Sequence, residues 1–355
     1  MEENKIMTEE LDPFVLHVTD TIDRLVSIDV SGYGVIGQLY DAARAYHDMP
    51  LSLLAATTLR THIKPLDTFF VTTGWMLPGT YPYTETDGPI GAAILGRALA
   101  LGLRARMVVL TEPEVVDAVK ACCRAAGLNV LSEDDLQEAP RPPHDGNAYC
   151  IVKAFPYGDS EAIEESRKLF DRYAPKAMVA IEKSGPNADG QYCMVDGSDN
   201  SDCVIRAARL FEEAARREVC TIGIGDRGNE IGFGTIQEVP QKLLPFGPQA
   251  VCTTEVDVLV TAAVSNWGAS AIAAALAIIL KNPDLLHDAV TEARLLDAAI
   301  GAGAVDGFSH RPILQTDGMG VRVHAAIVEV LNEIVRAPAA SGLSLSSTPL
   351  FRRPA

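Results

Sequence analysis

The segment at residues 223–234, GIGDRGNEIGFG, places charged side chains among glycines directly after an apolar run. Its first glycines follow the Gly-x-Gly-x-x-Gly spacing of a dinucleotide-binding fingerprint. That fingerprint normally opens the first strand–helix unit of a fold and holds a pyrophosphate, whereas this segment lies late in the chain. Asp226 and Glu230 would also put negative charge where the pyrophosphate belongs. Because an isolated match is weak evidence, we predict no nucleotide cofactor.

The same segment is better suited to a cation and a small polar substrate. Glycines permit a tight turn and the close approach of a ligand. Asp226, Asn229 and Glu230 would then supply oxygen atoms, and Arg227 could form a forked ion pair with a carboxylate. Oxygen ligands are those that Mg²⁺, Mn²⁺ and Ca²⁺ prefer.

Four further loops carry polar side chains, and three of them lie at the ends of predicted strands. Glu85 and Asp87 stand two positions apart at a strand-to-helix junction, where they could cap the helix or hold a cation. Glu182 ends a buried strand, and a buried carboxylate needs a partner. Asn266 follows another strand and could cap the next helix or face the same site. Residues 305–318 contain two Asp-Gly pairs, which could be plain turns or could close the site from the far side.

The elements that must position these loops alternate between strands and helices. Short apolar, β-branched runs predict strands at 67–74, 104–110, 148–155, 177–182, 219–224 and 256–264. Helical patterns separate them, which predicts an α/β fold: a mostly parallel sheet with helices on both faces, in three layers. Since parallel strands end at the same edge, the polar loops should gather there.

The chain divides into three parts by pattern. Residues 1–66 read as a helical N-terminal segment that packs on the main domain. Residues 67–336 form the α/β domain, and the polar, proline-rich stretch 133–147 could divide it into two lobes. Residues 337–355 have little pattern and are expected to be a flexible tail.

Composition excludes several classes of protein. The chain has 355 residues, 48% of them hydrophobic, and a formal net charge of -17. This acidic excess argues against nucleic acid and anionic membranes as partners. The seven cysteines show no zinc spacing and are expected to be reduced. The acidic start lacks a signal peptide, and the apolar stretch 271–280 is too short to span a bilayer, so we predict a cytoplasmic protein. The apolar helices could also support a homodimer.

The chain resembles the D-glutamate cyclase family, long catalogued as a domain of unknown function. The resemblance covers roughly residues 50–335 and rests on five motifs: TTG…TETDGP (72–89), DGQYCM (189–194), GDRGNEIGFG (225–234), VSNWG (264–268) and VDG…TDG (305–318). The chain departs from its relatives at Arg227, where they usually have a second glycine. It departs again at Lys183-Ser184-Gly185, where they have Arg-Pro-Gly. Both changes bear on the identity of the substrate.

The resemblance implies a lyase that interconverts D-glutamate with 5-oxo-D-proline and water. The α-amine must attack an anionic γ-carboxylate, so a divalent cation (Mn²⁺ or Mg²⁺, with Ca²⁺ as an alternative) would polarise that group. A carboxylate must also move the proton. The expected metal ligands or bases are Glu85, Asp87, Glu182, Asp226 and Glu230, of which Asp226, Glu230 and Glu182 are the expected catalytic residues. The expected substrate-binding residues are Thr73, Gly74, Thr86, Lys183, Arg227, Asn229 and Asn266, with Lys183 or Arg227 on the α-carboxylate.

Three other functions remain open from the residues alone. A metal-dependent hydrolase or phosphoesterase would use the same acidic cradle, although it would favour histidine ligands, and the chain has only seven histidines. A non-catalytic protein that binds an amino acid or a cation would not need acid–base carboxylates. A nicotinamide-dependent oxidoreductase rests only on the glycine spacing.

Overall fold

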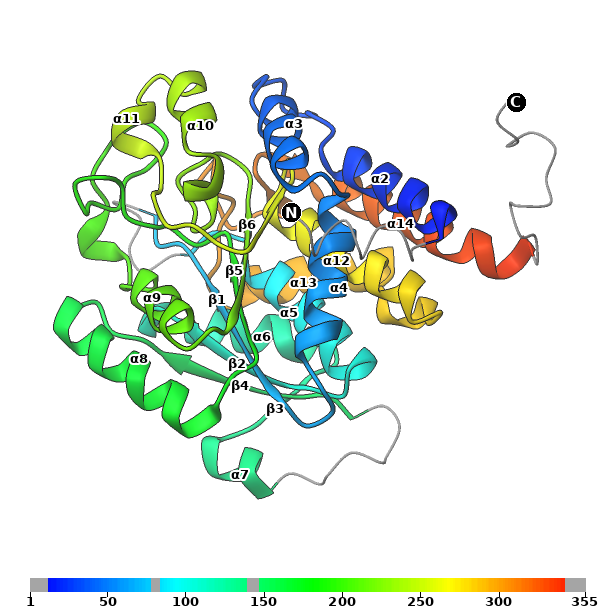
Figure 1. Ribbon diagram of the computed structural model, residues 1–355, viewed down its shortest axis with the longest axis horizontal. Helices are drawn as coiled ribbons and strands as arrows, with labels where there is room; N and C mark the ends of the chain where they lie inside the picture. Colours follow the sequence, from blue (N-terminus) through cyan, green and yellow to red (C-terminus); the bar gives the residue numbers. More distant parts are fainter. Residues whose placement is uncertain (1–11, 78–83, 139–146, 342–355) are drawn as a thin grey trace.

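A seven-stranded sheet lies at the centre of the molecule, and every pair of neighbouring strands in it is parallel (Figure 1). The computed structural model describes residues 12–77, 84–138 and 147–341. The strand order is β3-β4-β2-β1-β5-β6-β7. The strands are β1 (Thr68–Thr73), β2 (Arg106–Thr111), β3 (Asn129–Val130), β4 (Tyr149–Ala154), β5 (Ala177–Ile181), β6 (Cys220–Gly225) and β7 (Val258–Thr261). A separate antiparallel pair joins β8 (Gln315–Thr316) to β9 (Met319–Gly320).

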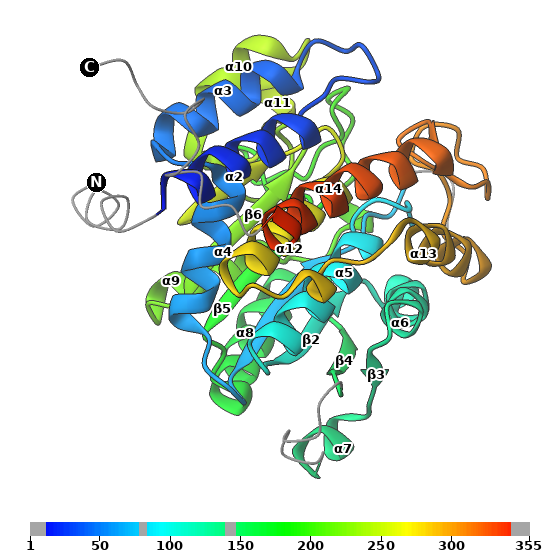
Figure 2. The ribbon, with the colours of Figure 1, turned by 90° about the vertical axis from the view of Figure 1, so that its right-hand side faces the viewer.

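Helices cover both faces of the sheet (Figures 1 and 2). The helices are α2 (Pro13–Val26), α3 (Ile36–His47), α4 (Leu51–His62), α5 (Pro89–Gly102), α6 (Val116–Ala125), α7 (Glu133–Glu138), α8 (Asp159–Tyr173), α9 (Ala208–Arg216), α10 (Glu238–Leu243), α11 (Gly247–Ala250), α12 (Ser265–Ile279), α13 (Ala289–Gly301) and α14 (Val321–Ser341). One face carries α8 and α9, and the other carries α4, α5, α6 and α12. The predicted three-layer α/β fold is therefore confirmed.

The strands at the middle of the sheet are apolar because both of their faces are covered. All residues of β1, β5 and β6 are buried. On one face α12 packs against α5, α4 and α2, and it is buried from Ser265 to Ala277. Small residues allow this close packing: a Cβ on Gly268 would lie 2.6 Å from the Ile224 side chain. Within the described residues, no helix is long and apolar enough to cross a membrane.

The N-terminal helices extend this second face beyond the edge strand β7. The backbone N–H of Ala263 donates to the carbonyl of Val26, at 2.8 Å. The N–H of Leu259 donates to Nε2 of His47, at 3.0 Å. Burial lowers the pKa of His47 to about 4, so its ring is neutral and can accept this bond. These bonds fasten α2 and α3 to the strand that borders the sheet.

The strand order reverses direction between β1 and β5. Strands β2, β4 and β3 extend the sheet on one side of β1, and β5, β6 and β7 extend it on the other. A crevice at the carboxyl ends of the strands forms at such a reversal, which is where α/β proteins bind ligands. The sheet continues across the segment 133–147, because β2 before it pairs with β4 after it. Residues 139–146, and the expected tail beyond residue 341, lie outside the described residues.

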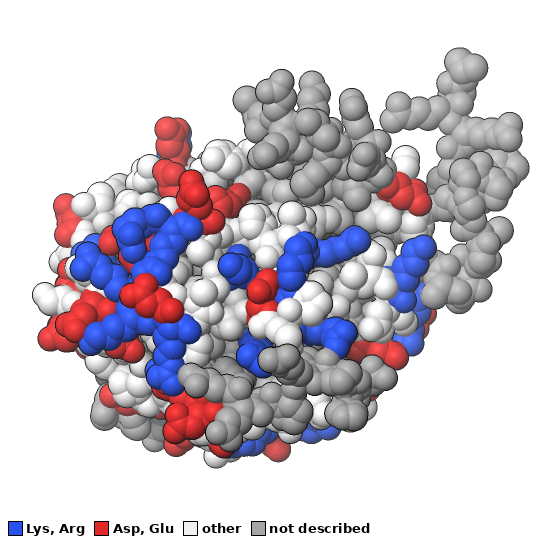
Figure 3. All heavy atoms as spheres, turned by 60° about the horizontal axis from the view of Figure 1, so that its bottom comes forward, with Lys and Arg blue, Asp and Glu red and all other residues white. Residues whose placement is uncertain are grey.

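Charged side chains of both signs are interspersed on the face that Figure 3 brings forward. Ion pairs join α8 and α9, such as Arg209 with Asp159 at 2.8 Å. Exposed pairs of this kind contribute little to the free energy of unfolding. The seven cysteines are unpaired, and all except Cys203 are buried, as expected of reduced thiols.

Candidate active site

A cavity of about 570 Å³ opens at the carboxyl ends of the central strands. Its acidic residues include Glu85, Glu182, Asp226 and Asp317, which come from three strand-end loops and from the loop between α13 and α14. Arg227 is the cationic side chain among the described residues that line it. The cavity therefore combines an acidic floor with a single guanidinium group.

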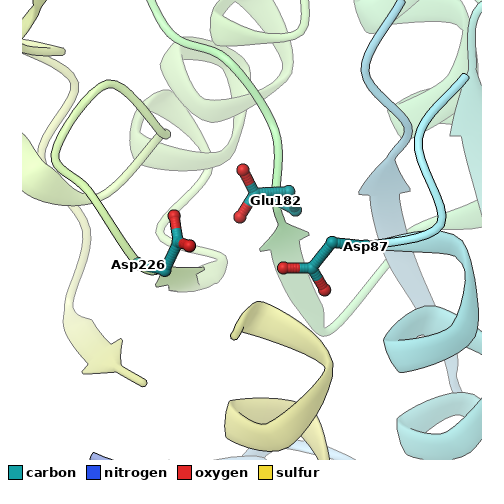
Figure 4. Close-up of side chains that lie close together, drawn as sticks. All are labelled: Asp87, Glu182 and Asp226. Atoms are coloured by element: carbon teal, nitrogen blue, oxygen red, sulfur yellow. The ribbon is translucent and has the colours of Figure 1, made fainter. Parts of the chain in front are cut away.

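Three carboxylates meet beside this floor, and we call them the carboxylate trio: Asp87, Glu182 and Asp226 (Figure 4). Each offers an oxygen atom, and these oxygens all lie within 4.8 Å of one another. Asp87 follows β1, Glu182 follows β5 and Asp226 follows β6, and these three strands are adjacent in the sheet. The structure thus brings together three of the five predicted metal ligands.

Asp226 has the least satisfied carboxylate of the trio. Its side chain is buried, yet neither oxygen has a hydrogen-bond partner. The nearest cation is the guanidinium of Arg227, at 3.1 Å from Oδ2. Burial raises the pKa of Asp226 well above its usual range; Arg227 opposes this shift, and the neighbouring Glu182 adds to it. A buried carboxylate that receives no hydrogen bonds is costly even beside one guanidinium group, and a bound cation would relieve that cost.

Glu182 is held in an unusual backbone conformation. Its φ of 45° lies in the left-handed region, which residues with a side chain rarely adopt. The Ser265 hydroxyl donates to its Oε2 at 2.6 Å. Burial raises the pKa of Glu182 well above its usual range. Strain of this kind gathers at functional sites, because the surrounding structure must enforce it.

Asp87 and Asn266 cap each other's helices. The carboxylate of Asp87 accepts from the N–H groups of Ser265 and Asn266 at the start of α12, both at 2.8 Å. In return, Oδ1 of Asn266 accepts from Gly88 at 3.0 Å and Gly91 at 2.6 Å, at the start of α5. Burial raises the pKa of Asp87 to about 8. Each residue was expected to cap its own helix or to face the site, and the structure has them exchange caps.

Glu230 directs both oxygens into its own loop. Its Oε1 accepts from Arg227 N–H at 3.1 Å and from Asp226 N–H at 3.3 Å, and its Oε2 accepts from Gly228 N–H at 2.7 Å. The residue is fully buried. These bonds shape the turn that presents Asp226. The role of Glu230 as a ligand or base stays a prediction.

The two candidate cations have different surroundings. Lys183 is fully buried, donates to the carbonyl of Gly74 at 2.8 Å and pairs with Glu112. Burial lowers its pKa. Arg227 lines the cavity, where its guanidinium lies 3.3 Å from Asp317 and 4.8 Å from the ring centre of Phe308. Arg227 is therefore the better placed of the two for a substrate carboxylate.

The remaining predicted residues have varied partners. Glu85 lines the cavity outside the trio, and its pKa is raised by burial and then by Asp317. Thr86 donates to the Gln315 carbonyl at 2.9 Å, which ties two loops of the site together. The buried hydroxyl of Thr73 has no hydrogen-bond partner. Asn229 lines the cavity and donates to the carbonyl of Cys193 at 3.1 Å.

Sequence reasoning missed several residues of the site. Ser265 was not among the expected site residues, although its hydroxyl donates to Glu182. Asp317 was noted only within a turn, whereas the structure has it line the cavity and contact Arg227 at 3.3 Å. The loop between α2 and α3 was not assigned to the site, yet Tyr33 lines the cavity and stacks on Phe308 with ring centres 5.7 Å apart. The glycines on either side of Tyr33 were the available signal.

Comparison with known proteins agrees with this geometry. Residues 22–332 match the family model described as "D-glutamate cyclase-like, C-terminal". The human protein "D-glutamate cyclase, mitochondrial" is 29% identical over 266 residues, which cover 72% of this chain and 38% of the human protein. The chain thus spans well under half the length of that relative. Since the family match takes in every strand of the sheet and the whole trio, the chain belongs to the D-glutamate cyclase-like family.

Proposed function

We propose that the chain is a lyase that converts D-glutamate to 5-oxo-D-proline and water, and catalyses the reverse reaction. The family and the human relative's name support the reaction. The observation that carries the proposal is the carboxylate trio, in which both oxygens of the buried Asp226 lack hydrogen-bond partners. Two carboxylate oxygens that accept no hydrogen bond from the described residues are available to a divalent cation.

The trio is chemically suited to Mn²⁺ or Mg²⁺, with Ca²⁺ as the alternative hard cation. All of its donors are carboxylate oxygens, which these ions prefer. Asp226 has two unbonded oxygens, and Glu182 has one oxygen bonded to Ser265. Asp87 would supply the third ligand while it also caps α12. When bound, the cation would polarise the γ-carboxylate and stabilise the negative charge that develops on it.

Arg227 would bind the α-carboxylate of the substrate. A guanidinium group can form two parallel hydrogen bonds to a carboxylate, which fixes orientation as well as position. Asp317 and Phe308 hold the side chain of Arg227 at the cavity wall. With the two ends of the substrate fixed, the amine lies near the γ-carbon, and ring closure gains from this proximity.

Glu85 would move the proton. It lines the cavity but lies outside the trio, so a cation held there leaves it free. Burial raises its pKa well above the usual value, which improves its match to the α-ammonium group. Glu85 would take in turn the two protons that the ammonium nitrogen loses before and after its attack, and would pass both to the departing γ-oxygen, which leaves as water. Glu230 would shape the loop that carries Asp226 and Arg227.

A proton NMR time course tests this function directly. Purified protein is mixed with D-glutamate and, separately, with 5-oxo-D-proline, each with added Mn²⁺, Mg²⁺ or Ca²⁺ and with EDTA. Interconversion that EDTA stops supports both the reaction and the cation. Interconversion that continues in EDTA supports the reaction and shows that it does not need a divalent cation. An absence of interconversion with any of the three cations overturns the proposal.

A further inference from the structure

The cavity is also lined by apolar side chains, most of which have no part in the proposed reaction of free glutamate. These side chains, which we call the apolar wall, are Tyr33, Leu77, Met194, Leu244, Phe246 and Phe308. Three of these, Tyr33, Phe246 and Phe308, are large hydrophobic side chains exposed on the surface of the protein. Exposed apolar side chains that cluster at one opening mark a binding surface, whereas single ones are ordinary.

The volume of the cavity also exceeds the needs of glutamate. Glutamate has ten non-hydrogen atoms. Even if each took the roughly 30 Å³ of a water molecule in the liquid, the molecule would fill about 300 Å³. The cavity measures about 570 Å³, so close to half of it would remain. Since apolar side chains make up much of the lining, the remaining space is suited to an apolar group on the substrate.

The charge of the cavity also favours a substrate whose γ-group is uncharged. Six acidic residues line it: Asp29, Glu85, Glu182, Asp196, Asp226 and Asp317. Arg227 is the cation among the described lining residues, and it already contacts Asp226 and Asp317. Counted formally, these six carboxylates outnumber the positive charge of Arg227 and a divalent cation together, and a free γ-carboxylate would add to that excess. A γ-amide presents a neutral carbonyl there, which is less costly to bury near carboxylates.

We propose that the preferred substrate is a γ-amide of D-glutamate whose amine carries an apolar group, an inference that rests on the proposed cyclase function. The α-amine nitrogen would form a bond to the γ-carbon, and the bond from the γ-carbon to the amide nitrogen would break. The electron pair of that bond leaves on the amide nitrogen, which takes the proton that the attacking amine loses. The products are 5-oxo-D-proline and a free apolar amine, and neither water nor a redox partner is consumed.

The two parts of the cavity divide the recognition of this substrate. The acidic floor and Arg227 would hold the glutamyl part, as proposed for glutamate itself. The amine substituent would extend toward Leu244 and Phe246 on the wall contributed by α10 and the segment that follows it. Since Phe246 is exposed, its removal should alter the binding of the substituent without disturbing the core.

Three compounds test the proposal with the full chain: D-glutamate, its γ-methylamide and its γ-benzylamide. Formation of 5-oxo-D-proline is followed by proton NMR and release of the amine by chromatography. We expect kcat/KM to be at least about tenfold higher for the benzylamide than for the methylamide, because only the benzyl group reaches the apolar wall.

Variants at the wall locate the effect. Phe246→Ala should lower kcat/KM for the benzylamide about tenfold and leave D-glutamate turnover unchanged, and Phe246→Leu should restore part of the loss. Tyr46→Ala removes another exposed aromatic, on α3 and outside the cavity lining, and should change none of the three rates.

The outcomes separate this proposal from the function on which it rests. Turnover of D-glutamate with no preference for the benzylamide overturns the proposal and leaves the cyclase function standing. Turnover of the benzylamide without turnover of D-glutamate supports the amide as the substrate and shows that free glutamate is not one. No turnover of any compound overturns both. If Phe246→Ala still prefers the benzylamide to the same extent, the benzyl group does not bind at Phe246 and the proposed position of the substituent is wrong.

Discussion

Two buried aspartates, Asp23 in α2 and Asp87 before α5, perform the same structural task in different regions of the molecule. Asp23 accepts from the first two N–H groups of α4, at 2.5 and 3.1 Å. Asp87 accepts from the first two N–H groups of α12, both at 2.8 Å. Burial raises the pKa of Asp23 to about 7 and that of Asp87 to about 8. Each satisfies helix N–H groups that would otherwise be unpaired.

The two regions differ in their neighbours. Asp23 belongs to no cluster of metal-ligating side chains among the described residues, whereas Asp87 stands beside Glu182 and Asp226. Both oxygens of Asp226 lack hydrogen-bond partners. A buried carboxylate that caps a helix is therefore no sign of an active site by itself. The sign is a second and a third carboxylate with oxygens that the protein leaves unused.

The variant Asp226→Asn should show the largest difference between the two regions. The amide has no charge to offer a cation, so we expect turnover of D-glutamate to fall at least about 1000-fold, about 4 kcal/mol in barrier height. The fold should remain, because the change removes one of several buried charges that repel each other. The NMR assay and thermal unfolding measure the two effects. Asp23→Asn is the matched control, and turnover of Asp226→Asn within tenfold of the parent protein would remove Asp226 from the reaction.

The pH dependence of the free energy of unfolding, compared between the parent protein and Asp23→Asn, measures the contribution of Asp23. The pKa of Asp23 is 3.8 in an unfolded chain and about 7 in the folded one, so the folded protein binds the proton more tightly. Its contribution to the free energy of unfolding is full below pH 3.8 and is lost as the pH rises to about 7. Each unit of difference between the two pKa values is worth about 1.4 kcal/mol, so the free energy of unfolding falls by roughly 4 kcal/mol. Denaturant unfolding from pH 4 to pH 8 should show a shallower decline in Asp23→Asn, and parallel curves would contradict the assignment.

Metal addition should distinguish the regions by stability alone. A cation that binds only the folded protein adds about 2.7 kcal/mol to the free energy of unfolding at a hundred times its Kd. We expect Mn²⁺ to raise the Tm of the parent protein and of Asp23→Asn by the same amount. Asp226→Asn should show little increase. An equal increase in all three proteins would mean that the ion binds elsewhere.

Glu230→Gln tests a third buried carboxylate that accepts backbone N–H groups. A glutamine side chain keeps one acceptor oxygen and turns an NH₂ group toward backbone donors. Unpaired buried groups of this kind cost roughly 1–3 kcal/mol, so we expect a lower Tm together with lower turnover. If Glu230 acts only as a base or ligand, turnover will be lost while the Tm is unchanged, and the loop-shaping role is then wrong.

The smallest expected effect is the loss of one capping bond in Asp23→Asn and in Asp87→Asn. Each should lower the free energy of unfolding by about 1 kcal/mol, as measured in denaturant at pH 4, where the folded protein holds both aspartates protonated. Only Asp87→Asn should also lower turnover, since Asp87 belongs to the trio. Equal activity in the two variants would show that Asp87, like Asp23, is a helix cap and nothing more.

Local pattern was sufficient to predict the fold and the gathering of the strand-end loops. Apolar runs bounded by turn residues predicted β1, β5 and β6, and helical spacing predicted the elements between them. Parallel strands end at one edge of a sheet, so the strand pattern alone placed Asp87, Glu182 and Asp226 at the same edge. The apolar runs and the alternation of strands and helices depend on residues close together in the chain, so a single sequence is enough to detect them.

Only the tertiary structure decided how each polar atom is used. Asp87 and Asn266 exchange caps across 179 positions of the chain, and Lys183 pairs with Glu112 across 71. Tyr33 reaches the cavity from a loop that the sequence left outside the site. These partners depend on the angle and depth at which helices pack, which short-range spacing does not encode. The sequence therefore determined which residues could do chemistry, and packing determined which of their oxygens remain free to do it.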